Sequence, residues 1–407
     1  MEKNSTFNIL MYSHDTYGLG HIRRTLAIAE HLSSDDTNIL ILTGSPLAGR
    51  FRFPPGVDFV RIPGMIKRSN DDYLPLSIRI DPLQALEIRK SIILATAKTF
   101  MPDLFIVDKE PLGLKREVLP TLEWLNRDLL KCSTILGLRD VMDDSDTVKD
   151  SWQKKDVYVS IEKLYTEVWV YGEKAIYDCI TEYAIPPSIS DKLYFTGYIP
   201  RKIPASFEVE EVRQKLNIDS DRPLVTVTTG GGADGFWVLN SFLTMLESMA
   251  ASNDILPFRS IIITGPFLLE DENAVVQERA RVLGVTVYTF LAHMEPLFAA
   301  SDLVVCMGGY NTLCEILSQQ TPSLVIPRET PRKEQLIRAM AMKSKGLVDY
   351  IPWPGVSPDL MQKKILGMLH DSSSFRRAMA DFKLTGIERI CSRISSFRDK
   401  KNGSRAS

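Results

Sequence analysis

Two short glycine-rich segments place groups that could bind a phosphate at the ends of predicted strands. Gly308 and Gly309 stand between an apolar run at 303–306 and a helical pattern, and 230–235 holds four glycines in a similar setting. A strand, a glycine turn and a helix start bring unpaired backbone N–H groups and the positive end of a helix dipole to one point. The sequence therefore predicts a phosphate or diphosphate site, with a flexible surface loop as the simpler alternative for 230–235.

Two polar side chains follow the glycines at 308–309. Glu315 comes about one helical turn inside the predicted helix, where a carboxylate could bind a pair of neighbouring hydroxyls. Gln335 follows the next apolar run, which ends at Pro327, and offers a second polar group. A capping box formed by Thr312 and Glu315 would explain both of these residues by helix initiation alone.

A third turn of this kind lies near the N-terminus, between a predicted strand at 7–12 and a predicted helix at 22–32. Its Gly18-x-Gly20 spacing resembles the start of a dinucleotide-binding fingerprint. The third glycine of that fingerprint is Arg23 here, and the next strand ends at Thr43 without an acidic residue for a ribose. The sequence therefore argues against NAD binding.

The composition is typical of a globular enzyme. The 407 residues are 44% hydrophobic and carry a net charge of −2, which gives no general attraction to nucleic acid. The five cysteines show no metal-binding spacing, so we expect reduced thiols, no bound metal and a cytoplasmic protein. Arg61, Lys67 and Arg68 are mixed with apolar residues and could make a weak peripheral contact with the inner face of a membrane, but the patch is short and irregular, so an ordinary loop is the better interpretation.

The order of predicted elements indicates an α/β fold with two parallel sheets. We expect an N-terminal domain at 1–196, a hinge or linker at 197–222, a C-terminal domain at 223–385, and a terminal helix with a disordered tail at 386–407. Two such sheets facing each other leave a cleft outside the carboxyl ends of their strands, where the three glycine turns fall.

The C-terminal half resembles the GT-B glycosyltransferases of family 28, over roughly 197–349. Its glycine turn at 231–235 is followed by Asn240, and its second turn at 308–312 is followed by Glu315. The family's later motif, a strand that ends in proline followed by Gln and Ala, is matched by Pro327, Gln335 and Ala339. A Gly-x-x-x-Arg motif at the predicted hinge is matched by Gly197 and Arg201.

The resemblance implies two Rossmann-like domains and a nucleotide-sugar donor, a UDP-sugar similar to a UDP-N-acetylhexosamine, as substrate without a further cofactor. Glu315 would bind the ribose diol, backbone at Phe290 and Leu291 would meet the base, and Gln335 would contact the donor sugar or the ribose. Arg201 and the two turns would hold the diphosphate. The donor residues assigned in this way are Arg201, Gly231, Gly232, Ala233, Asp234, Gly235, Leu291, Gly308, Gly309, Asn311, Thr312, Glu315 and Gln335.

The N-terminal half departs from the family pattern, because its first loop keeps only Gly18 and Gly20 before His21. This half would bind the acceptor, which the sequence leaves unknown, with Asp108 and Glu110 on the acceptor side. A transfer to a hydroxyl needs a base within hydrogen-bond reach. His21 is the first candidate, followed by Asp15 and His14, although His21 could instead cap its helix or bind phosphate.

The predicted function is therefore an inverting, metal-independent glycosyltransferase. A nucleotide-sugar hydrolase or 2-epimerase on the same fold is the main alternative. A nucleotide-binding scaffold without activity is the third class, which the retained Glu315, Gln335 and Arg201 disfavour.

Overall fold

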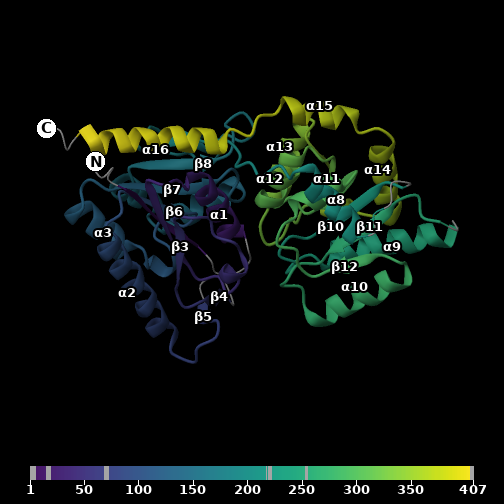
Figure 1. Ribbon diagram of the computed structural model, residues 1–407, viewed down its shortest axis with the longest axis horizontal. Helices are drawn as coiled ribbons and strands as arrows, with labels where there is room; N and C mark the ends of the chain where they lie inside the picture. The colour runs from purple at the N-terminus through teal and green to yellow at the C-terminus, as the bar shows by residue number, and fades with distance from the viewer. Residues whose placement is uncertain are drawn as a thin grey trace. The chain divides into compact units, whose positions relative to one another are not determined.

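The computed structural model describes residues 6–14, 20–67, 73–216, 218, 222–252 and 255–403. The chain forms two compact units (Figure 1). Unit 1 comprises Met1–Ile199 and Thr385–Ser407, and unit 2 comprises Pro200–Leu384.

Unit 1 is built on a parallel sheet that has seven strands within the described residues, in the order β3-β2-β1-β6-β7-β8-β9. The strands of this sheet are β1 (Phe7–Ser13), β2 (Thr37–Thr43), β3 (Val57–Arg61), β6 (Leu104–Asp108), β7 (Ser133–Arg139), β8 (Glu167–Tyr171) and β9 (Leu193–Phe195). A small antiparallel hairpin pairs β4 (Met65–Lys67) with β5 (Tyr73–Pro75). The helices are α1 (Gly20–Leu32), α2 (Pro82–Phe100), α3 (Leu119–Asp128), α4 (Ser145–Lys154), α5 (Val157–Leu164), α6 (Cys179–Glu182), α7 (Pro187–Ser190), α16 (Gly386–Gly403) and the 3-10 turns η1 (Ala48–Arg50) and η2 (Leu114–Arg116).

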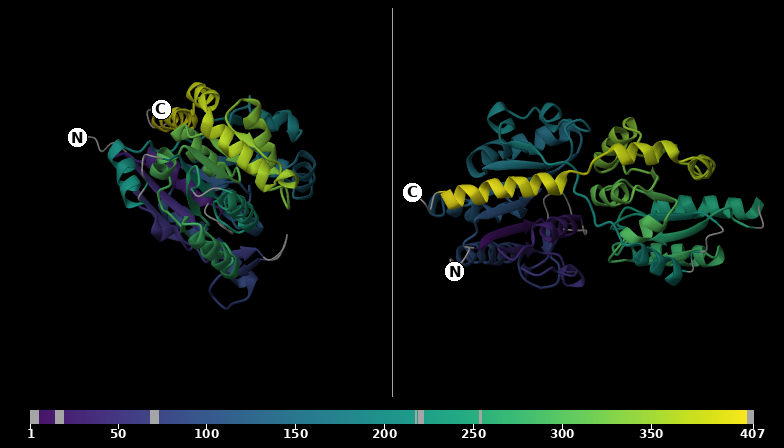
Figure 2. Two further views of the ribbon diagram at one scale, coloured as in Figure 1. Left: turned by 90° about the vertical axis from the view of Figure 1, so that its right-hand side faces the viewer. Right: turned by 45° about the horizontal axis from the view of Figure 1, so that its top comes forward.

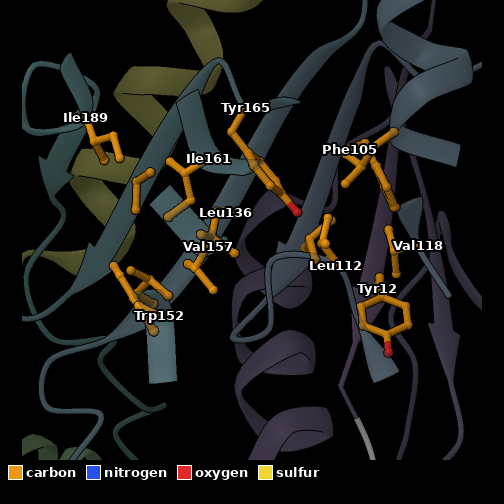
Figure 3. Close-up of a cluster of buried hydrophobic side chains, with 14 of the residues drawn as sticks. Tyr12, Phe105, Leu112, Val118, Leu136, Trp152, Val157, Ile161, Tyr165 and Ile189 are labelled. Atoms are coloured by element: carbon orange, nitrogen blue, oxygen red, sulfur yellow. The ribbon is translucent and has the colours of Figure 1, made fainter. Parts of the chain in front are cut away.

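The core of unit 1 explains why its strands read as nearly continuous apolar runs. Parallel strands covered on both faces bury almost every residue, and all five residues of β6 are buried. Figure 3 shows part of this core, with Phe105 of β6, Leu136 of β7 and Trp152 of α4 among the packed side chains. Tyr12 of β1 lies in the same cluster, and its hydroxyl group is therefore held inside the unit.

Unit 2 contains a second parallel sheet, with the order β12-β11-β10-β13-β14-β15 within the described residues. Its strands are β10 (Leu224–Thr228), β11 (Arg259–Ile263), β12 (Thr286–Tyr288), β13 (Leu303–Cys306), β14 (Ser323–Val325) and β15 (Asp349–Tyr350). Its helices are α8 (Ser206–Lys215), α9 (Phe236–Ser252), α10 (Glu270–Val282), α11 (Glu295–Ala300), α12 (Tyr310–Gln319), α13 (Glu334–Ser344), α14 (Pro358–His370), α15 (Ser373–Asp381) and the 3-10 turn η3 (Trp353–Gly355). The apolar face predicted for α9 is buried in the core, including Val238, Phe242 and Leu246.

The C-terminal helix α16 belongs to unit 1, and Figures 1 and 2 show it lying along that unit in three views. Arg393 donates to Glu167 of β8, Arg398 donates to Asp36 over 2.7 Å, and Lys401 donates to Asp103 over 2.7 Å. We expected a disordered tail from Asp399 onward, but α16 continues to Gly403. Contacts between distant parts of the chain hold this polar segment in a helix, and local composition does not reveal them.

The predicted α/β class with two parallel sheets is confirmed. The strands β3, β9 and β15 at the sheet edges were not predicted, because they are only partly buried and lack the continuous apolar run of central strands such as β6. The predicted hinge at 197–222 contains α8, and the boundaries of the two units lie at Ile199 and Leu384.

The structure does not support membrane contact by the apolar side chains of Ile62 and Met65, in the basic and apolar segment at 61–68. Ile62 and Met65 are buried and pack inside unit 1, so these apolar side chains cannot meet a membrane surface. Arg61 is exposed, whereas Arg68 lies outside the described residues. Within the part of the chain that the structure describes, no helix combines the length and the apolar character needed to cross a membrane.

Candidate functional site

The two glycine turns of unit 2 lie side by side at the carboxyl edge of its sheet. β10 and β13 are neighbours, with Thr228 paired to Cys306 at the ends of the two strands. A Cβ atom added at Gly230 would come within 3.9 Å of Thr312 Oγ1, so the first turn approaches the first turn of α12. The structure therefore brings together the two segments that the sequence assigned to one phosphate site.

Glycine is required at two of these positions for different reasons. Gly232 has a φ of +95°, and a Cβ atom there would lie 2.5 Å from the carbonyl oxygen of Thr264. Gly308 has a φ of +75°, and a Cβ atom would lie 2.7 Å from Val325. Gly309 differs from both, because a Cβ atom would meet nothing within 4 Å. The N-terminus of α12 thus opens onto free space at Gly309.

The start of α12 excludes the capping-box interpretation of Thr312 and Glu315. The helix begins at Tyr310 with Gly309 as its N-cap, so Thr312 already lies inside the first turn. Glu315 is further along the helix and is only 1% exposed. A buried carboxylate in this position is not explained by helix initiation.

Arg201 packs against the first turn of α12. Its Nη2 atom donates to Asn311 Oδ1 over 2.9 Å, its backbone N–H donates to Ser318 Oγ over 2.8 Å, and the residue is 8% exposed. A cation beside the positive end of a helix dipole is electrostatically unfavourable unless an anion joins it. Arg201 therefore places a guanidinium beside the first turn of α12.

Arg328 connects two predicted donor residues and was missed in the sequence. Its backbone N–H donates to Gln335 Oε1 over 2.9 Å, and its guanidinium contacts Asp234 and donates to Glu334 over 2.5 Å. The glycine turn that contains Asp234 and the loop before α13 are thus joined by one side chain. In the sequence, Arg328 directly follows Pro327, the proline that ends a predicted strand. Loops often carry a cation in such a position, so this residue gave no distinctive signal.

The loop after β12 lies next to the first glycine turn. Gly265 donates to the carbonyl oxygen of Thr289 over 3.0 Å, and a Cβ atom on Gly265 would come within 2.5 Å of Gly231. Leu291 is half-buried two residues after Thr289. Gly235 begins the approach to α9, where a Cβ atom would collide with Thr229, and Ala233 is exposed. The predicted donor residues therefore gather at one edge of unit 2.

Unit 1 presents a histidine–carboxylate pair at the carboxyl edge of its own sheet. The Nδ1 atom of His21, at the start of α1, contacts Asp108 Oδ2 at the end of β6. Arg24, one turn further along α1, donates to Asp108 Oδ1 from Nε over 3.1 Å and from Nη2 over 2.5 Å. Although burial raises the pKa of Asp108, the charges of Arg24 and His21 outweigh it and hold this pKa below its ordinary value. Asp108 is therefore an ionised acceptor for the imidazole.

Burial lowers the pKa of His21 to about 4, against the opposing effect of Asp108. The ring is therefore neutral at physiological pH, and its side chain remains 15% exposed. A neutral imidazole that donates from Nδ1 to a carboxylate carries a basic lone pair on Nε2. Arg24 was not among the predicted site residues, because its role depends on a pairing 84 positions along the chain.

His14 lies beside His21, with ring centroids 5.7 Å apart at an angle of 85°. Its Nδ1 atom is 3.3 Å from the hydroxyl of Tyr12, which in turn donates to Glu117 over 2.6 Å. Glu117 forms an ion pair with Arg89, and both of these residues are fully buried. Burial lowers the pKa of His14 well below its ordinary value. This buried network was not predicted from the sequence.

Of the remaining predicted site residues of unit 1, the structure describes Gly20 and Glu110. Asp15 and Gly18 lie outside the described residues, and Gly20 is the exposed first residue of α1. Glu110 follows Asp108 closely, and its carboxylate lies 3.7 Å from the ammonium group of Lys109. Within the described residues, no three His, Cys, Asp or Glu side chains are grouped so that they could hold a metal ion.

Comparison with solved structures shows the class of fold. MurG of Acinetobacter baumannii aligns with a TM-score of 0.57 and 12% identity, over 96% of this chain and 99% of that one. A glycosyltransferase from Rickettsia africae aligns with a TM-score of 0.59 and 11% identity, over 97% of this chain and 98% of that one. The fold is therefore that of the GT-B glycosyltransferases, as predicted.

Comparison of sequences shows a similarity to a known family. Residues 224–394 match the glycosyltransferase family 28 C-terminal domain. The UDP-N-acetylglucosamine--N-acetylmuramyl-(pentapeptide) pyrophosphoryl-undecaprenol N-acetylglucosamine transferase of Acetivibrio thermocellus is 28% identical over 204 residues, which are 50% of this chain and 54% of the relative. The chain thus spans about half the length of the curated relatives it matches.

Proposed function

We propose that this protein is a glycosyltransferase that moves a sugar from a UDP-sugar, similar to a UDP-N-acetylhexosamine, to a hydroxyl group of an acceptor. Unit 2 binds the donor, and unit 1 supplies the base and the groups that bind the acceptor. The observation that carries the proposal is the His21–Asp108 pair, held by Arg24, in a chain whose residues 224–394 match the family 28 C-terminal domain.

The donor half of the proposal, which is the binding of the UDP-sugar, rests on residues at the carboxyl edge of the sheet in unit 2. The open N-terminus of α12 at Gly309, the glycine turn at 230–235 and Arg201 supply positive charge and N–H groups for a diphosphate. Glu315 binds the ribose hydroxyls, and Gln335, oriented by Arg328, binds the sugar. Such groups neutralise the leaving diphosphate without requiring a metal ion.

The chemical step uses His21 as the general base. The acceptor hydroxyl gives its proton to Nε2, its oxygen bonds to the anomeric carbon, and the bond from that carbon to the diphosphate oxygen breaks, releasing UDP. Asp108 stabilises the imidazolium that forms, as the carboxylate does in a histidine–carboxylate triad. One displacement without a protein nucleophile inverts the anomeric centre.

A surface of unit 1 suits weak peripheral contact with a membrane that carries the acceptor. Leu76, Ile78 and Leu83 are exposed large apolar side chains, with Leu83 at 72%, and Arg79 is exposed beside them. Exposed apolar side chains with a neighbouring cation bind anionic lipid surfaces. Co-sedimentation with anionic vesicles tests this contact, which a Leu83→Asp, Ile78→Asp double variant should lose.

A thermal-shift experiment with UDP, GDP, ADP and NAD tests the donor half. UDP at about 100 times its dissociation constant should stabilise the fold by roughly 2.7 kcal/mol. Glu315→Gln should lose this shift, whereas Glu278→Gln, an exposed carboxylate of α10, should keep it. A shift with NAD alone, or none with any nucleotide, would contradict the proposal. The anomeric configuration of a product, read by NMR, tests inversion.

A further inference from the structure

The proton on the hydroxyl of Tyr12 can be assigned from the contacts of that hydroxyl. Its oxygen lies 2.6 Å from Glu117 Oε1, 3.3 Å from the backbone nitrogen of Leu114 and 3.3 Å from His14 Nδ1. Arg89 donates to both oxygens of Glu117 over 2.5 Å inside the core, so both oxygens act as acceptors. A 2.6 Å contact between a phenol and a carboxylate needs a proton between the oxygens. Tyr12 therefore donates to Glu117.

The single proton of Tyr12 fixes the tautomer of His14. Once the phenol donates to Glu117, its oxygen can only accept from its other two neighbours. Leu114 supplies a backbone N–H, and His14 must therefore carry its proton on Nδ1. Burial and the nearby Glu117 raise the pKa of Tyr12 well above its ordinary value, so the phenol keeps its proton. The Nε2 atom of His14 is then an unprotonated acceptor.

The Nε2 atom of His21 is also an unprotonated acceptor, but for a different reason. Its Nδ1 atom faces the ionised Asp108 and donates to it, while the Arg24 guanidinium 3.3 Å away directs its own hydrogen bonds to Asp108 Oδ1. No described residue hydrogen-bonds to Nε2 of either histidine, and the two rings are 5.7 Å apart between centroids. Two neutral imidazoles thus offer two hydrogen-bond acceptors in one small region.

We propose that His14 is a second hydroxyl-binding residue of the acceptor site, fixed by Tyr12, and that the acceptor presents two neighbouring hydroxyls, as a sugar or another polyol does. The inference rests on the proposed function: His21 takes the proton of the reacting hydroxyl, and His14 accepts a hydrogen bond from the adjacent one. Tyr12 is a positioning residue, because it acts through the tautomer of His14.

Hydroxyls fit this pair of acceptors better than a metal ion does. Asp108 is already engaged by His21 and Arg24, and the carboxylate of Glu110 lies 3.7 Å from the ammonium group of Lys109, which leaves two imidazoles without a third ligand from the described residues. Neutral nitrogens that cannot donate select ligands that bring their own protons. A polyol brings one proton for each nitrogen.

The tautomers can be measured directly in the whole protein labelled with ¹⁵N-histidine. The chain has five histidines, so His14→Gln and His21→Gln assign the two sets of ring signals. The expected result is an Nδ1–H tautomer for both. Tyr12→Phe should shift His14 toward the Nε2–H form, whereas Tyr165→Phe, which removes another buried phenol bonded to the carbonyl oxygen of Pro111, should not. An Nε2–H form of His14 in the wild-type protein overturns the inference without any variant.

The selectivity of the enzyme among acceptors tests whether the acceptor presents two neighbouring hydroxyls. The probes are octyl hexopyranosides and their monodeoxy forms, with UDP-N-acetylglucosamine as donor and UDP release as the signal. Removing the hydroxyl next to the glycosylated one should raise KM about ten-fold in the wild-type enzyme, with a smaller change in kcat, and should change KM little in His14→Gln. Equal effects in both proteins contradict a role for His14. If no polyol is glycosylated while UDP still stabilises the fold, the diol class is wrong but the donor half of the proposed function stands.

Discussion

His21 and Asp108 meet through a hydrogen bond although they are 87 positions apart, one at the start of α1 and the other at the end of β6. The two elements are fixed by one buried sheet, because β1, which leads toward α1, pairs directly with β6. The same carboxylate also accepts from Arg24, so the imidazole and the guanidinium share one partner. The contact fixes the orientation of the His21 ring, which in the proposed function would prepare this base before a substrate binds.

The first prediction concerns Asp108→Asn. The amide no longer stabilises the imidazolium and can reverse the tautomer of His21, so kcat for UDP release should fall about 10³- to 10⁴-fold. The dissociation constant of UDP, measured by calorimetry, should stay within about two-fold because unit 2 binds it. Asp146→Asn, at an exposed carboxylate of α4, is the matched control and should leave kcat unchanged. A kcat for Asp108→Asn within ten-fold of wild type would remove His21 as the base.

The second prediction concerns pH and stability. Burial lowers the pKa of His21 from 6.5 in the unfolded chain to about 4, so the unfolded state takes up a proton first as the pH falls. The stability from the neutral ring is fully present above pH 6.5 and is lost as the pH falls toward 4, with a slope of at most about 1.4 kcal/mol per pH unit. Asp108, whose pKa is also lowered, loses its contribution only below the range where free aspartate titrates. Both groups therefore destabilise the fold in acid.

Urea unfolding between about pH 7 and pH 4.5 measures this slope. His21→Gln should lower this slope by up to about 1.4 kcal/mol per pH unit, because the amide has nothing to titrate, and should leave the part due to His14, whose pKa burial also lowers. His370→Gln, at the exposed end of α14, is the control that should leave it unchanged. An unchanged slope in His21→Gln would mean that the folded protein protonates this ring as readily as the unfolded chain.

How far the sequence predicts this site depends on the range of the interactions involved. The strand–glycine–helix order at 230–235 and 308–312 is local, so the sequence could place both glycine turns and Glu315 at one edge of unit 2. The His21–Asp108 contact joins two residues that were singled out separately, but nothing local pairs them. Arg24 has no such local signature either. Charges that are buried because they pair across the sheet look like ordinary surface charges in the sequence.

The Tyr12–Glu117–Arg89 network shows the same limit. Tyr12 lies in an apolar run and reads as a core residue, which it is, and its hydroxyl contact with Glu117 spans 105 positions. His14 was predicted as a base because of its residue type. Its contact with Tyr12, rather than with a carboxylate, suggests the different role proposed above. The residue types in the loop could not distinguish a base from a hydroxyl-binding histidine, because the distinction depends on which residue contacts the imidazole ring.

The third prediction concerns Arg328, whose side chain joins the glycine turn to the start of α13, the helix that carries Gln335. Arg328→Gln should raise the dissociation constant of UDP-N-acetylglucosamine about ten-fold, because Asp234 and Glu334 lose their common partner and the start of α13 is held less firmly, although the backbone bond to Gln335 remains. The affinity for UDP alone should change less than two-fold. Arg281→Gln, an exposed arginine paired with Glu278 on α10, is the control. Equal losses for UDP and for the UDP-sugar would place Arg328 at the diphosphate instead.

The fourth prediction concerns the attachment of α16 to unit 1. Arg393 binds Glu167, a buried residue that also accepts from Trp169 Nε1 over 2.9 Å. Arg393→Met keeps most of the apolar stem but leaves this carboxylate with one partner fewer, which should cost about 1–2 kcal/mol in the free energy of unfolding. Arg376→Met, on the exposed face of α15, should cost less than about 0.5 kcal/mol. Urea unfolding compares the two, and similar values would mean that α16 is not anchored at Glu167.

The last prediction separates stability from binding at two adjacent glycines. Gly308→Ala places a Cβ atom 2.7 Å from Val325 in a left-handed conformation, so it should destabilise the fold by about 1–3 kcal/mol. Gly309→Ala meets no atom within 4 Å and has a φ of −61°, so stability should change by less than about 0.5 kcal/mol.

The Gly309→Ala substitution nevertheless puts a methyl group into the free space at the N-terminus of α12. We therefore expect Gly309→Ala to weaken UDP binding about ten-fold, since the diphosphate must approach those N–H groups closely. Gly367→Ala, a glycine of α14 with no atom within 4 Å of the added Cβ, controls for the extra methyl group. Unfolding in urea and calorimetry with UDP give the two quantities. Normal UDP affinity in Gly309→Ala would show that the diphosphate does not bind at this helix end.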